Sequence, residues 1–547
     1  MAQSNAGYDY IIVGAGSAGC TLAGRLTEDP NIRVALIEAG KKDDSLLVRM
    51  PAGVGNLIGD QNDYNWGFWT APQKHLNNRK LWWPRGKGWG GSSSINGMIY
   101  IRGHAGDYDQ WRQMGLSGWG YDDVLPYFKK SETLDKGADE FHGGEGPLQV
   151  STSAASEPLY EAFIEAGKSS GYPYTPDFNG AQQEGVGPYQ LTIHDGERWS
   201  ASFAYLRPAL ERPNLTVIST GRVTKVLVEN GKAIGVEYVA GKRGVPEQVY
   251  ADAEVLVCAG AVQSPQILQL SGLGKADDLR AQGIDVKADL PGVGANLQDH
   301  LDISMVYKCS QKITAYSKQS GIKKLFVGLI YMLRKQGPGR DNFLQAGGFL
   351  KSREGLDRPD IQLHFVNAAM IDHGKGDADY DGFTIHACQL RPESRGTVGL
   401  TSADPFADPL IDANYLDSQE DMRVMRESVK MSREIAYQAA FDEYRASEVL
   451  PAKAPESDAD IDDFIRANAE TIYHPVGTVR MGADDAAPLD DQLRVRGVDG
   501  LRVVDASVMP TLIGGNTNAP TIMIAEKISD HIRGKDFLPR QALDFVD

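Results

Sequence analysis

The opening part of the chain alternates between short apolar runs and a helical pattern. An apolar run over residues 10–13 leads into a glycine-rich turn, and a helical segment follows over 18–26. A second apolar run covers 34–37 and ends at Glu38. Short continuous apolar runs joined by a helix are typical of parallel strands that are buried on both faces. We therefore predict a strand–helix–strand unit here.

The same pattern returns much further along the chain. The apolar runs that predict strands there are 215–218, 223–229, 233–239 and 254–258. Gly231 is expected to join the second and third of these in a hairpin. The fourth leads into a helix that we expect to begin at Ser264, with Pro265 in its first turn. Both strand-to-helix units are expected to lie in one sheet, with an insertion between them.

The remaining segments predict a second layer. Strands and a long helix between residues 300 and 450 indicate an antiparallel sheet that forms a pocket wall. The acidic, proline-containing stretch 452–463 is expected to be an exposed linker, and the C-terminal part returns to the α/β pattern. The other predicted elements are helices 122–132, 157–169, 417–438 and 519–532 and strands 360–368, 382–390 and 501–505.

The glycine-rich turn carries the first functional signal. Gly14 allows a tight turn out of the strand, Gly16 lets a pyrophosphate approach the backbone, and Gly19 lets the helix pack against the sheet. The free N–H groups at the helix start attract phosphates. Glu38 lies where a carboxylate can accept hydrogen bonds from both ribose hydroxyls, and it would repel a 2′-phosphate. The turn therefore predicts a site for FAD or NAD, and not for NADP.

Composition narrows the possible partners. The chain has 547 residues, and its formal net charge of −17 argues against nucleic acid as a partner. Four scattered cysteines without metal-like spacing indicate a reducing compartment without disulfides, and we expect no signal peptide before the first strand. We expect a cytoplasmic protein with no metal site. The composition gives no indication of an oligomeric state.

One segment is a candidate for membrane contact. Residues 325–333 form an apolar helical stretch with basic residues on both sides, but nine residues cannot span a bilayer. A buried or lid helix is the favoured interpretation. The alternative is a peripheral contact with the inner membrane face through 323–335.

Candidate chemistry lies in a serine-rich block and near the C-terminus. Residues 85–97 combine glycines with three serines, which suits a second helix start that faces an anion, although a plain loop is the alternative. His474 could accept a proton near neutral pH, but surface and core histidines are commoner. Asn516 and Asn518 precede the last helix and could cap it or hold a substrate oxygen. The sequence has no zinc-like histidine pair, nucleophile elbow or Walker lysine.

Together these residues resemble the glucose–methanol–choline oxidoreductases, FAD-dependent enzymes that oxidise alcohols. Four blocks spanning most of the chain carry the resemblance, and the second and third are similar to the two family signatures. The parts between them resemble the branch that contains choline dehydrogenase and the aliphatic alcohol dehydrogenases. The blocks are 14–38, 86–99, 260–274 and 474–520.

The resemblance implies an α/β fold with an α+β substrate part. A Rossmann-like FAD-binding domain, discontinuous in sequence, would accompany a substrate domain with an antiparallel sheet covered by helices. The FAD-binding domain would comprise 1–155, 215–300 and 469–547, and its last part would close the domain and carry the catalytic pair. The substrate domain would comprise 156–214 and 301–468.

The resemblance also implies roles for single residues. His474 matches the family's catalytic histidine, and Asn516, chosen over Asn518 by its distance from the terminal helix, matches the second member of the catalytic pair. Ile95 stands where some members attach FAD covalently through a histidine, so we expect non-covalent FAD. The residues expected to bind FAD are Gly14, Gly16, Ser17, Gly19, Glu38, Trp66, Gly91, Ser92, Asn96, Val223, Ala259, Asp505, Thr517 and Asn518.

The expected reaction is oxidation of a primary alcohol to an aldehyde. His474 would take the hydroxyl proton, Asn516 would donate a hydrogen bond to the oxygen, and a hydride would pass to flavin N5. The electrons would go on to a quinone or another acceptor. An oxidase that uses oxygen, another FAD chemistry on the same fold and a redox-silent FAD-binding protein are the alternatives.

The substrate is less closely defined by these residues. Choline-oxidising relatives tend to carry a glutamate at the position of Asp302, where it faces the trimethylammonium group. Asp302 keeps the charge on a shorter side chain, but it could equally be structural. The apolar segment 325–349 would border the entrance and favours an uncharged alcohol, so choline is the second choice.

Overall fold

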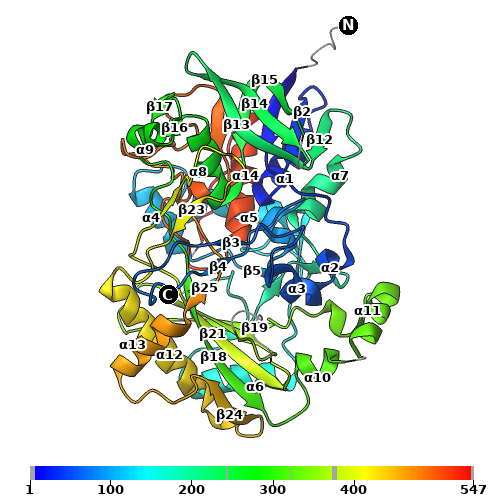
Figure 1. The fold of residues 1–547 in the computed structure, drawn as a ribbon. Coiled ribbons are helices and arrows are strands. Elements are labelled where there is room, and N and C mark those ends of the chain that lie inside the picture. The colour runs from blue at the N-terminus through cyan, green and yellow to red at the C-terminus, as the bar shows by residue number, and fades with distance from the viewer. Residues whose placement is uncertain (1–6, 242–243, 322, 372–377, 544–547) are drawn as a thin grey trace.

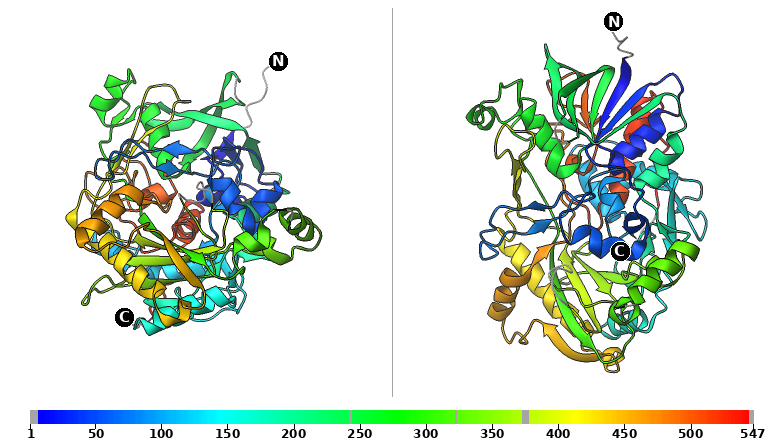
Figure 2. Two further views of the ribbon diagram at one scale, coloured as in Figure 1. Left: turned by 60° about the horizontal axis from the view of Figure 1, so that its bottom comes forward. Right: turned by 45° about the vertical axis from the view of Figure 1, so that its right-hand side comes forward.

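The computed structural model describes residues 7–241, 244–321, 323–371 and 378–543. Two seven-stranded sheets lie in opposite halves of the molecule (Figures 1 and 2). The sheet that contains the N-terminal strand lies in the upper half of Figure 1, and an antiparallel sheet lies in the lower half. The predicted α/β fold with an α+β substrate part is confirmed. The domain boundaries given above stay a prediction.

The first sheet joins the two predicted strand-to-helix units. Its strands, in spatial order, are β12 (Leu215–Ser219), β2 (Val34–Glu38), β1 (Tyr8–Val13), β15 (Pro246–Val257), β14 (Lys232–Ala240) and β13 (Gly221–Glu229), with β26 (Leu501–Val503) beside β15. Strand β1 pairs in parallel with both β2 and β15. The first half of β15 pairs with the hairpin β13–β14, and its second half lies between β1 and β26. The expectation of one sheet with an insertion is therefore confirmed.

Helices from the two ends of the chain meet beside this sheet. Helix α1 (Ser17–Leu26) packs on α14 (Asn518–Ile532), and α14 also packs on α5 (Tyr121–Ser131). All but three residues of α14 are buried, from Ala519 to Asp530. An ion pair between Arg25 and Glu526, with 2.8 Å between Nη2 and Oε1, fastens α1 to α14.

The second strand-to-helix unit differs from the prediction at both ends. Strand β15 is longer than 254–258, because its first half continues the hairpin beyond the buried core. Helix α8 (Gly260–Leu270) begins before the predicted Ser264, so Pro265 lies inside it. Proline has no N–H for the carbonyl of Ala261, one turn earlier. The hydroxyl of Thr478 donates to that carbonyl instead, at 2.6 Å, and this satisfies the group that the proline leaves without a partner.

The second sheet is antiparallel and mostly buried. Its strands, in spatial order, are β24 (Arg445–Leu450), β18 (Leu301–Cys309), β21 (Gly382–Gln389), β20 (Ile361–Val366), β19 (Ala346–Leu350) and β8 (Gly185–Pro188), with β25 (Glu470–Thr471) beside β18. Helices α12 (Gln419–Ala436) and α6 (Pro158–Ser169) pack on its outer face. The predicted strands 360–368 and 382–390 and the predicted helix 417–438 are confirmed, whereas β18 and β19 were not predicted.

Two local predictions were wrong. The predicted linker 452–463 contains the start of α13 (Asp458–Asn468), where Ser457 and Asp460 form a capping box. Acidic residues in the first turn of a helix stabilise it, so the charge that indicated a linker marks a helix start. The serine block forms a single 3₁₀ turn, Gly91–Ser94, rather than the start of a longer helix.

Shorter elements complete the fold, and in the described ranges no helix is both long and apolar enough to cross a membrane. The other helices are α2 (Leu46–Arg49), α3 (Val54–Ile58), α4 (Ala105–Gln113), α7 (Arg207–Ala209), α9 (Ala276–Ala281), α10 (Ala315–Gln319) and α11 (Lys323–Arg334). The other strands are β3 (Phe68–Trp69), β4 (Trp82–Trp83), β5 (Ile99–Tyr100), β6 (Glu132–Leu134), β7 (Leu148–Thr152), β9 (Gln190–Leu191), β10 (Ile193–His194), β11 (Glu197–Arg198), β16 (Leu273–Gly274), β17 (Ala288–Asp289), β22 (Thr397–Gly399) and β23 (Leu410–Asp412).

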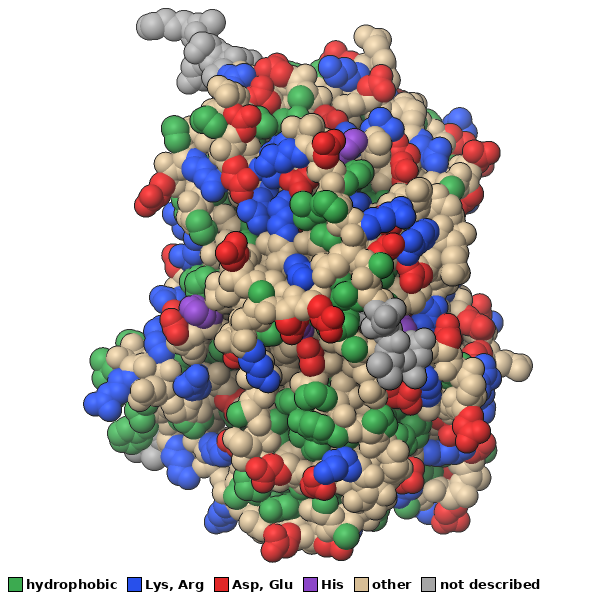
Figure 3. Space-filling model, turned by 180° about the vertical axis from the view of Figure 1, so that it is seen from behind, with side chains coloured by type: hydrophobic (Ala, Val, Ile, Leu, Met, Phe, Trp, Pro, Cys, Tyr) green, Lys and Arg blue, Asp and Glu red, His purple; other side chains and the backbone are tan. Residues whose placement is uncertain are grey.

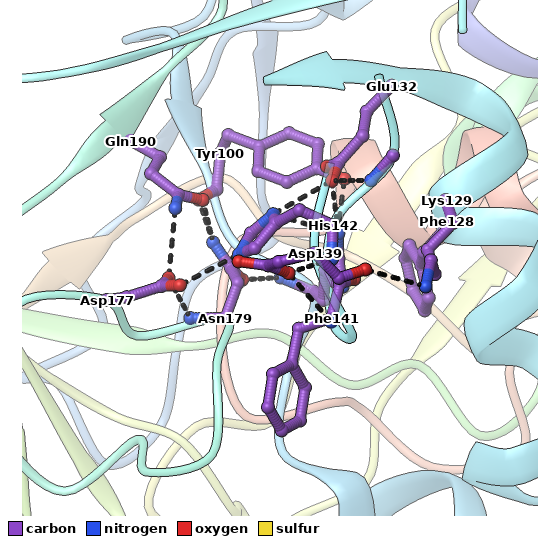
Figure 4. Close-up of polar contacts among 12 residues, drawn as sticks. Tyr100, Phe128, Lys129, Glu132, Asp139, Phe141, His142, Asp177, Asn179 and Gln190 are labelled. Atoms are coloured by element: carbon purple, nitrogen blue, oxygen red, sulfur yellow. Dashed lines mark hydrogen bonds and ion pairs between the residues drawn. The ribbon is translucent and has the colours of Figure 1, made fainter. Parts of the chain in front are cut away.

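A buried ionic network stabilises the segment around β6 (Figure 4). Arg102 pairs with Glu132 at 2.5 Å, and His142 lies 2.8 Å from both Glu132 and Asp177. Burial alone would raise the pKa of Glu132, but the Arg102 guanidinium and His142 hold it at about 2. Burial opposes protonation of His142, whereas its hydrogen bonds to Asp177 and Glu132 prevail and raise its pKa. Each buried charge therefore has an opposite partner, as burial requires.

Candidate active site

A cavity of about 490 Å³ is lined by residues from both halves of the molecule. Its walls include the glycine turn after β1, the serine block, the start of α14 and strands β20 and β21 of the antiparallel sheet. Segments from the beginning, the middle and the end of the chain therefore share one site.

Two glycine-rich turns form one end of the cavity. The N–H of Gly90 donates to the carbonyl of Ala15 at 2.8 Å, and a Cβ atom on Gly91 would lie 2.8 Å from the Cα atom of Gly16. Gly91 also has a φ of +51°, which favours glycine. The two turns thus pack backbone against backbone, and side chains are excluded between them.

Glu38 links these two turns. Its carboxylate accepts hydrogen bonds from the N–H groups of Ala15 at 2.8 Å, Gly40 at 2.7 Å and Gly88 at 3.0 Å. Burial raises the pKa of Glu38, and the three N–H donors oppose that rise. The side chain lines the cavity where the sequence predicted a ribose contact, and it also holds the serine block against the first turn.

Two uncapped helix starts face this end of the cavity. No side chain caps the first turn of α1 or of α14. The hydroxyl of Ser17 donates to Oδ1 of Asn518 at 2.7 Å, so the two helix starts lie side by side. Free N–H groups and the positive end of the helix dipole favour a phosphate group. The glycine turns and these helix starts therefore fit a dinucleotide with a diphosphate.

The predicted FAD-binding residues lie around this cavity with one exception. Gly19 does not line it. A Cβ atom on Gly19 would lie only 1.9 Å from the carbonyl oxygen of Gly14, so this glycine serves the close packing of α1 on the turn. Asp505 accepts from the N–H of Gly260 at 2.8 Å and thereby holds the start of α8. The others that line the cavity are Gly14, Gly16, Ser17, Glu38, Trp66, Gly91, Ser92, Asn96, Val223, Ala259, Thr517 and Asn518.

His474 and Asn516 meet at the other end of the cavity. The Nδ2 atom of Asn516 lies 3.1 Å from Nε2 of His474, and both side chains line the cavity. His474 is buried, with 9% of its surface exposed, and burial lowers its pKa well below the usual value. A neutral imidazole nitrogen and an amide N–H therefore face the same space, where they can accept a proton and donate a hydrogen bond.

Asp299 holds the loop that carries His474. Its carboxylate accepts from the backbone N–H of His474 at 2.7 Å and from the hydroxyls of Tyr415 and Thr471. Burial raises the pKa of Asp299 to about 6. Sequence analysis did not select Asp299, because its side-chain partners lie in β25 and in the segment after β23, far from it along the chain.

The antiparallel sheet presents a polar face to the site. In β20, Ile361, Leu363 and Phe365 pack into the core, whereas His364 and Val366 line the cavity. Strand β21 continues this face with His386, which also lines the cavity. Along β20 the residues that face the cavity alternate with core residues, which is also the pattern of a strand with one face exposed to solvent.

Asp302 lies behind the cavity wall. It is 1% exposed, does not line the cavity, and accepts from Nδ1 of His386 at 2.7 Å. Among the residues that the structure describes, the carboxylates on the cavity wall are Glu38 and Asp505, both held by backbone N–H groups. The negative charge of Asp302 is therefore screened from the cavity by His386.

A dinucleotide cradle that opens onto a buried base and an amide donor is the arrangement of a dinucleotide-dependent oxidoreductase. Residues 8–302 and 392–525 match the N-terminal and C-terminal parts of GMC oxidoreductases. The chain belongs to the GMC oxidoreductase family.

Known relatives share nearly the whole chain. The mitochondrial choline dehydrogenase of Homo sapiens is 47% identical over 98% of this chain and 91% of its own length. The oxygen-dependent choline dehydrogenase of Brucella ovis is 45% identical, over 97% and 96%. Pyridoxine 4-oxidase from Mesorbium loti superposes with a TM-score of 0.88 at 34% identity, over 97% of this chain and 100% of that one. The predicted family, the FAD cofactor and FAD-dependent alcohol oxidation are confirmed.

Proposed function

We propose that this protein oxidises an uncharged primary alcohol to the aldehyde, with His474 as the base and Asn516 as the donor to the alcohol oxygen. The observation that carries the proposal is the pair itself, 3.1 Å apart on the wall of the cavity that the glycine turns open into. FAD, when bound, supplies the two-electron oxidant. The fourteen residues of the predicted FAD site and the predicted domain boundaries belong to the same proposal.

The chain's own groups account for the proton. Burial keeps the His474 ring neutral near neutral pH, so one of its nitrogens has a free lone pair that can accept the hydroxyl proton. Nδ2 of Asn516 donates a hydrogen bond that strengthens as negative charge develops on the alcohol oxygen. Asp299 fixes the backbone from which His474 projects, so the base is held in place before the alcohol arrives.

An uncharged alcohol fits the reacting end better than a cation does. The wall there combines His364 and His386 with apolar side chains that include Phe343, Leu344 and Val366, and no described carboxylate lines it. Choline is the second candidate, because choline dehydrogenases are among the relatives and Asp302 lies directly behind His386.

Turnover by one purified enzyme preparation separates the two candidates. We expect kcat/KM for butanol or benzyl alcohol to exceed that for choline, and Asp302→Asn to leave the ratio within about threefold. A higher kcat/KM for choline that Asp302→Asn abolishes would establish choline as the substrate. FAD that no alcohol reduces under anaerobic conditions would refute the oxidoreductase proposal and indicate a redox-silent protein.

A quinone or another organic acceptor is proposed to reoxidise the enzyme, with oxygen as the alternative. Relatives are named both as dehydrogenases and as oxygen-dependent enzymes, so the name alone does not decide. Stopped-flow reoxidation of the alcohol-reduced enzyme by a soluble quinone, compared with air-saturated buffer, tests this. Non-covalent FAD is proposed because Ile95 has no nucleophilic atom, and acid precipitation should release the flavin.

Helix α11 is proposed to contact the surface of a membrane from the cytoplasmic side. Leu325, Phe326 and Leu333 are 76%, 58% and 72% exposed, although such residues are usually buried. Hydrophobic and basic side chains gather on the protrusion that α10 and α11 form, at the lower left of Figure 3. Apolar residues flanked by Lys323, Lys324, Arg334 and Lys335 suit the interface of an anionic bilayer.

Vesicle co-sedimentation tests this contact. The full protein should bind vesicles that contain phosphatidylserine, and Leu325→Gln with Leu333→Gln should weaken the binding at least tenfold. Leu410→Gln serves as a matched control, because Leu410 is an exposed leucine on β23, away from α11. Equal loss in the control, or no binding at all, would count against the proposal.

A further inference from the structure

We infer that Gln362 and His300 are positioning residues that fix which atoms His474 and Asn516 present to the alcohol. Each does so through a chain of hydrogen bonds that begins at a backbone carbonyl. The inference rests on the proposed function for its role in catalysis, but the hydrogen bonds themselves do not depend on the substrate.

The first chain determines the tautomer of His474. The carbonyl of Leu390 can only accept, so Nε2 of His300, 3.1 Å away, carries a proton. His300 is fully buried and burial lowers its pKa to about 3, so the ring is neutral and its Nδ1 has no proton. Nδ1 of His474, at 3.0 Å from that nitrogen, must then donate. The remaining nitrogen of His474, Nε2, is left with a free lone pair that faces the cavity.

The second chain determines the orientation of Asn516. The carbonyl of Leu363 accepts from the hydroxyl of Tyr189 at 2.6 Å, so the oxygen of Tyr189 can accept but has no second proton to give. Nε2 of Gln362 lies 3.2 Å from that oxygen and donates to it. The same amide nitrogen donates to Oδ1 of Asn516 at 3.1 Å. With its oxygen engaged, Asn516 must direct Nδ2 towards His474.

Reversing Gln362 would break both of its contacts. Its Oε1 would then face the oxygen of Tyr189 and Oδ1 of Asn516, and two acceptors would meet at each contact. Among the residues that the structure describes, no group donates to Oε1 of Gln362, and this buried oxygen is the cost of the orientation. The two contacts made by Nε2 outweigh that cost, because reversal would turn both of them into contacts between acceptors. Gln362 is fully buried, which makes an unmatched contact expensive.

The two chains agree where they meet. The first requires that Nε2 of His474 accept, and the second requires that Nδ2 of Asn516 donate; these two atoms are 3.1 Å apart. The chains start at carbonyls in different segments, after β21 and within β20, so the agreement is not a consequence of one local turn. An alcohol oxygen that enters between the two atoms finds an acceptor for its proton and a donor for its lone pair.

The tautomers can be measured without any turnover. In holoenzyme labelled with ¹⁵N-histidine, the imidazole nitrogens report which atom carries the proton, and His474→Ala and His300→Gln assign the two rings. We expect the Nε2–H tautomer for His300 and the Nδ1–H tautomer for His474. A proton on Nε2 of His474 would overturn the inference. An enzyme that shows the expected tautomers but is reduced by no alcohol would refute the proposed function alone.

Variants then test the catalytic consequence. Gln362→Met keeps the side-chain length but removes the donor, so the rate constant of FAD reduction by alcohol should fall about tenfold or more. Gln389→Met removes a buried glutamine from the same sheet whose amide donates to Asp421, and it controls for lost stability. If the rate constant of FAD reduction falls equally in both variants, Gln362 has only a structural role.

His300 has a similar test by rescue. Glutamine carries a donor and an acceptor on one amide and can serve both neighbours, whereas leucine can serve neither. We expect His300→Gln to reduce FAD at least about tenfold faster than His300→Leu, with equal FAD content in both. Equal rates in the two variants would show that the polarity of this position does not matter.

Discussion

Substitution by alanine should have different effects at Gly16 and at Gly19, the second and third glycines of the first glycine-rich motif. A Cβ atom on Gly19 would lie 1.9 Å from the carbonyl oxygen of Gly14, within the fold itself. A Cβ atom on Gly16 would have its nearest neighbour, the carbonyl oxygen of Cys258, 3.8 Å away, and the backbone φ of −74° is open to any residue. Gly16→Ala should therefore leave the protein folded and obstruct only the cofactor.

The expected magnitudes follow from these distances. Restoring an ordinary contact of 3.4 Å at Gly19 would move α1 by about 1.5 Å from the turn. Forced overpacking of this kind lowers the free energy of unfolding by about 1–3 kcal/mol. At Gly16 the apoprotein should lose less than about 0.5 kcal/mol. Its affinity for FAD should fall at least tenfold, which corresponds to about 1.4 kcal/mol.

Denaturant unfolding of the apoproteins and titration with FAD measure the two effects separately. Gly328→Ala is the control, because a Cβ atom there meets nothing within 4 Å and the residue lies in α11, outside the FAD site. If Gly16→Ala destabilises the apoprotein as much as Gly19→Ala does, the separation of roles is wrong. Unchanged FAD affinity in Gly16→Ala would refute the proposed approach of the diphosphate.

Three further predictions concern the base, the ionic network and the proline in α8. His474→Ala should lower the rate of FAD reduction at least about a hundredfold with full FAD content. Wild-type kcat/KM should stay flat from about pH 8 to 7, because burial lowers the pKa of this base, and should change only as Asp299, whose pKa is about 6, becomes protonated. Glu132→Gln should lower the free energy of unfolding by about 3–5 kcal/mol at neutral pH. The pKa of Glu132 is lowered from 4.5 to about 2, so the stabilisation that its carboxylate provides is complete above pH 4.5 and is lost as the pH falls from 4.5 to about 2. Unfolding curves at several pH values would measure this loss. Thr478→Val should cost about 1–3 kcal/mol by leaving the carbonyl of Ala261 unpaired, and an unchanged denaturation midpoint would contradict that account.

The spacing of residues along the chain was enough to predict the glycine-rich turn, because all of its residues lie close together in sequence. Gly14, Gly16, Gly19 and Glu38 lie within one strand–helix–strand unit, so their spacing alone determines the geometry of the turn. The predicted start of α8 at Ser264 was wrong because Pro265 was expected in the first turn. The proline is tolerated inside the helix because the hydroxyl of Thr478, which is distant in sequence, donates to the carbonyl of Ala261. The start of α8 therefore depends on a contact between distant segments.

The positioning residues were beyond prediction for a related reason. Gln362 alternates with Ile361 and Leu363 in β20, and such alternation normally indicates a strand with one face in water. Only the arrangement of both sheets shows that the polar face lines a cavity. The resemblance to a family identified His474 and Asn516, whereas their partners His300 and Gln362 follow only from the hydrogen bonds in the structure.

The pairing of α1 with α14 has a consequence for synthesis of the protein. Arg25 and Glu526 are 501 positions apart, as are Ser17 and Asn518, and both pairs join α1 to α14; Ser17 and Asn518 also line the cavity. A ribosome must therefore synthesise 501 further residues after Arg25 before α1 can contact Glu526 on α14. A chain truncated before residue 518 would lack one of the two helix starts at the diphosphate. Tight FAD binding thus requires that α14 has been synthesised, and bound FAD should in turn stabilise the contact between α1 and α14.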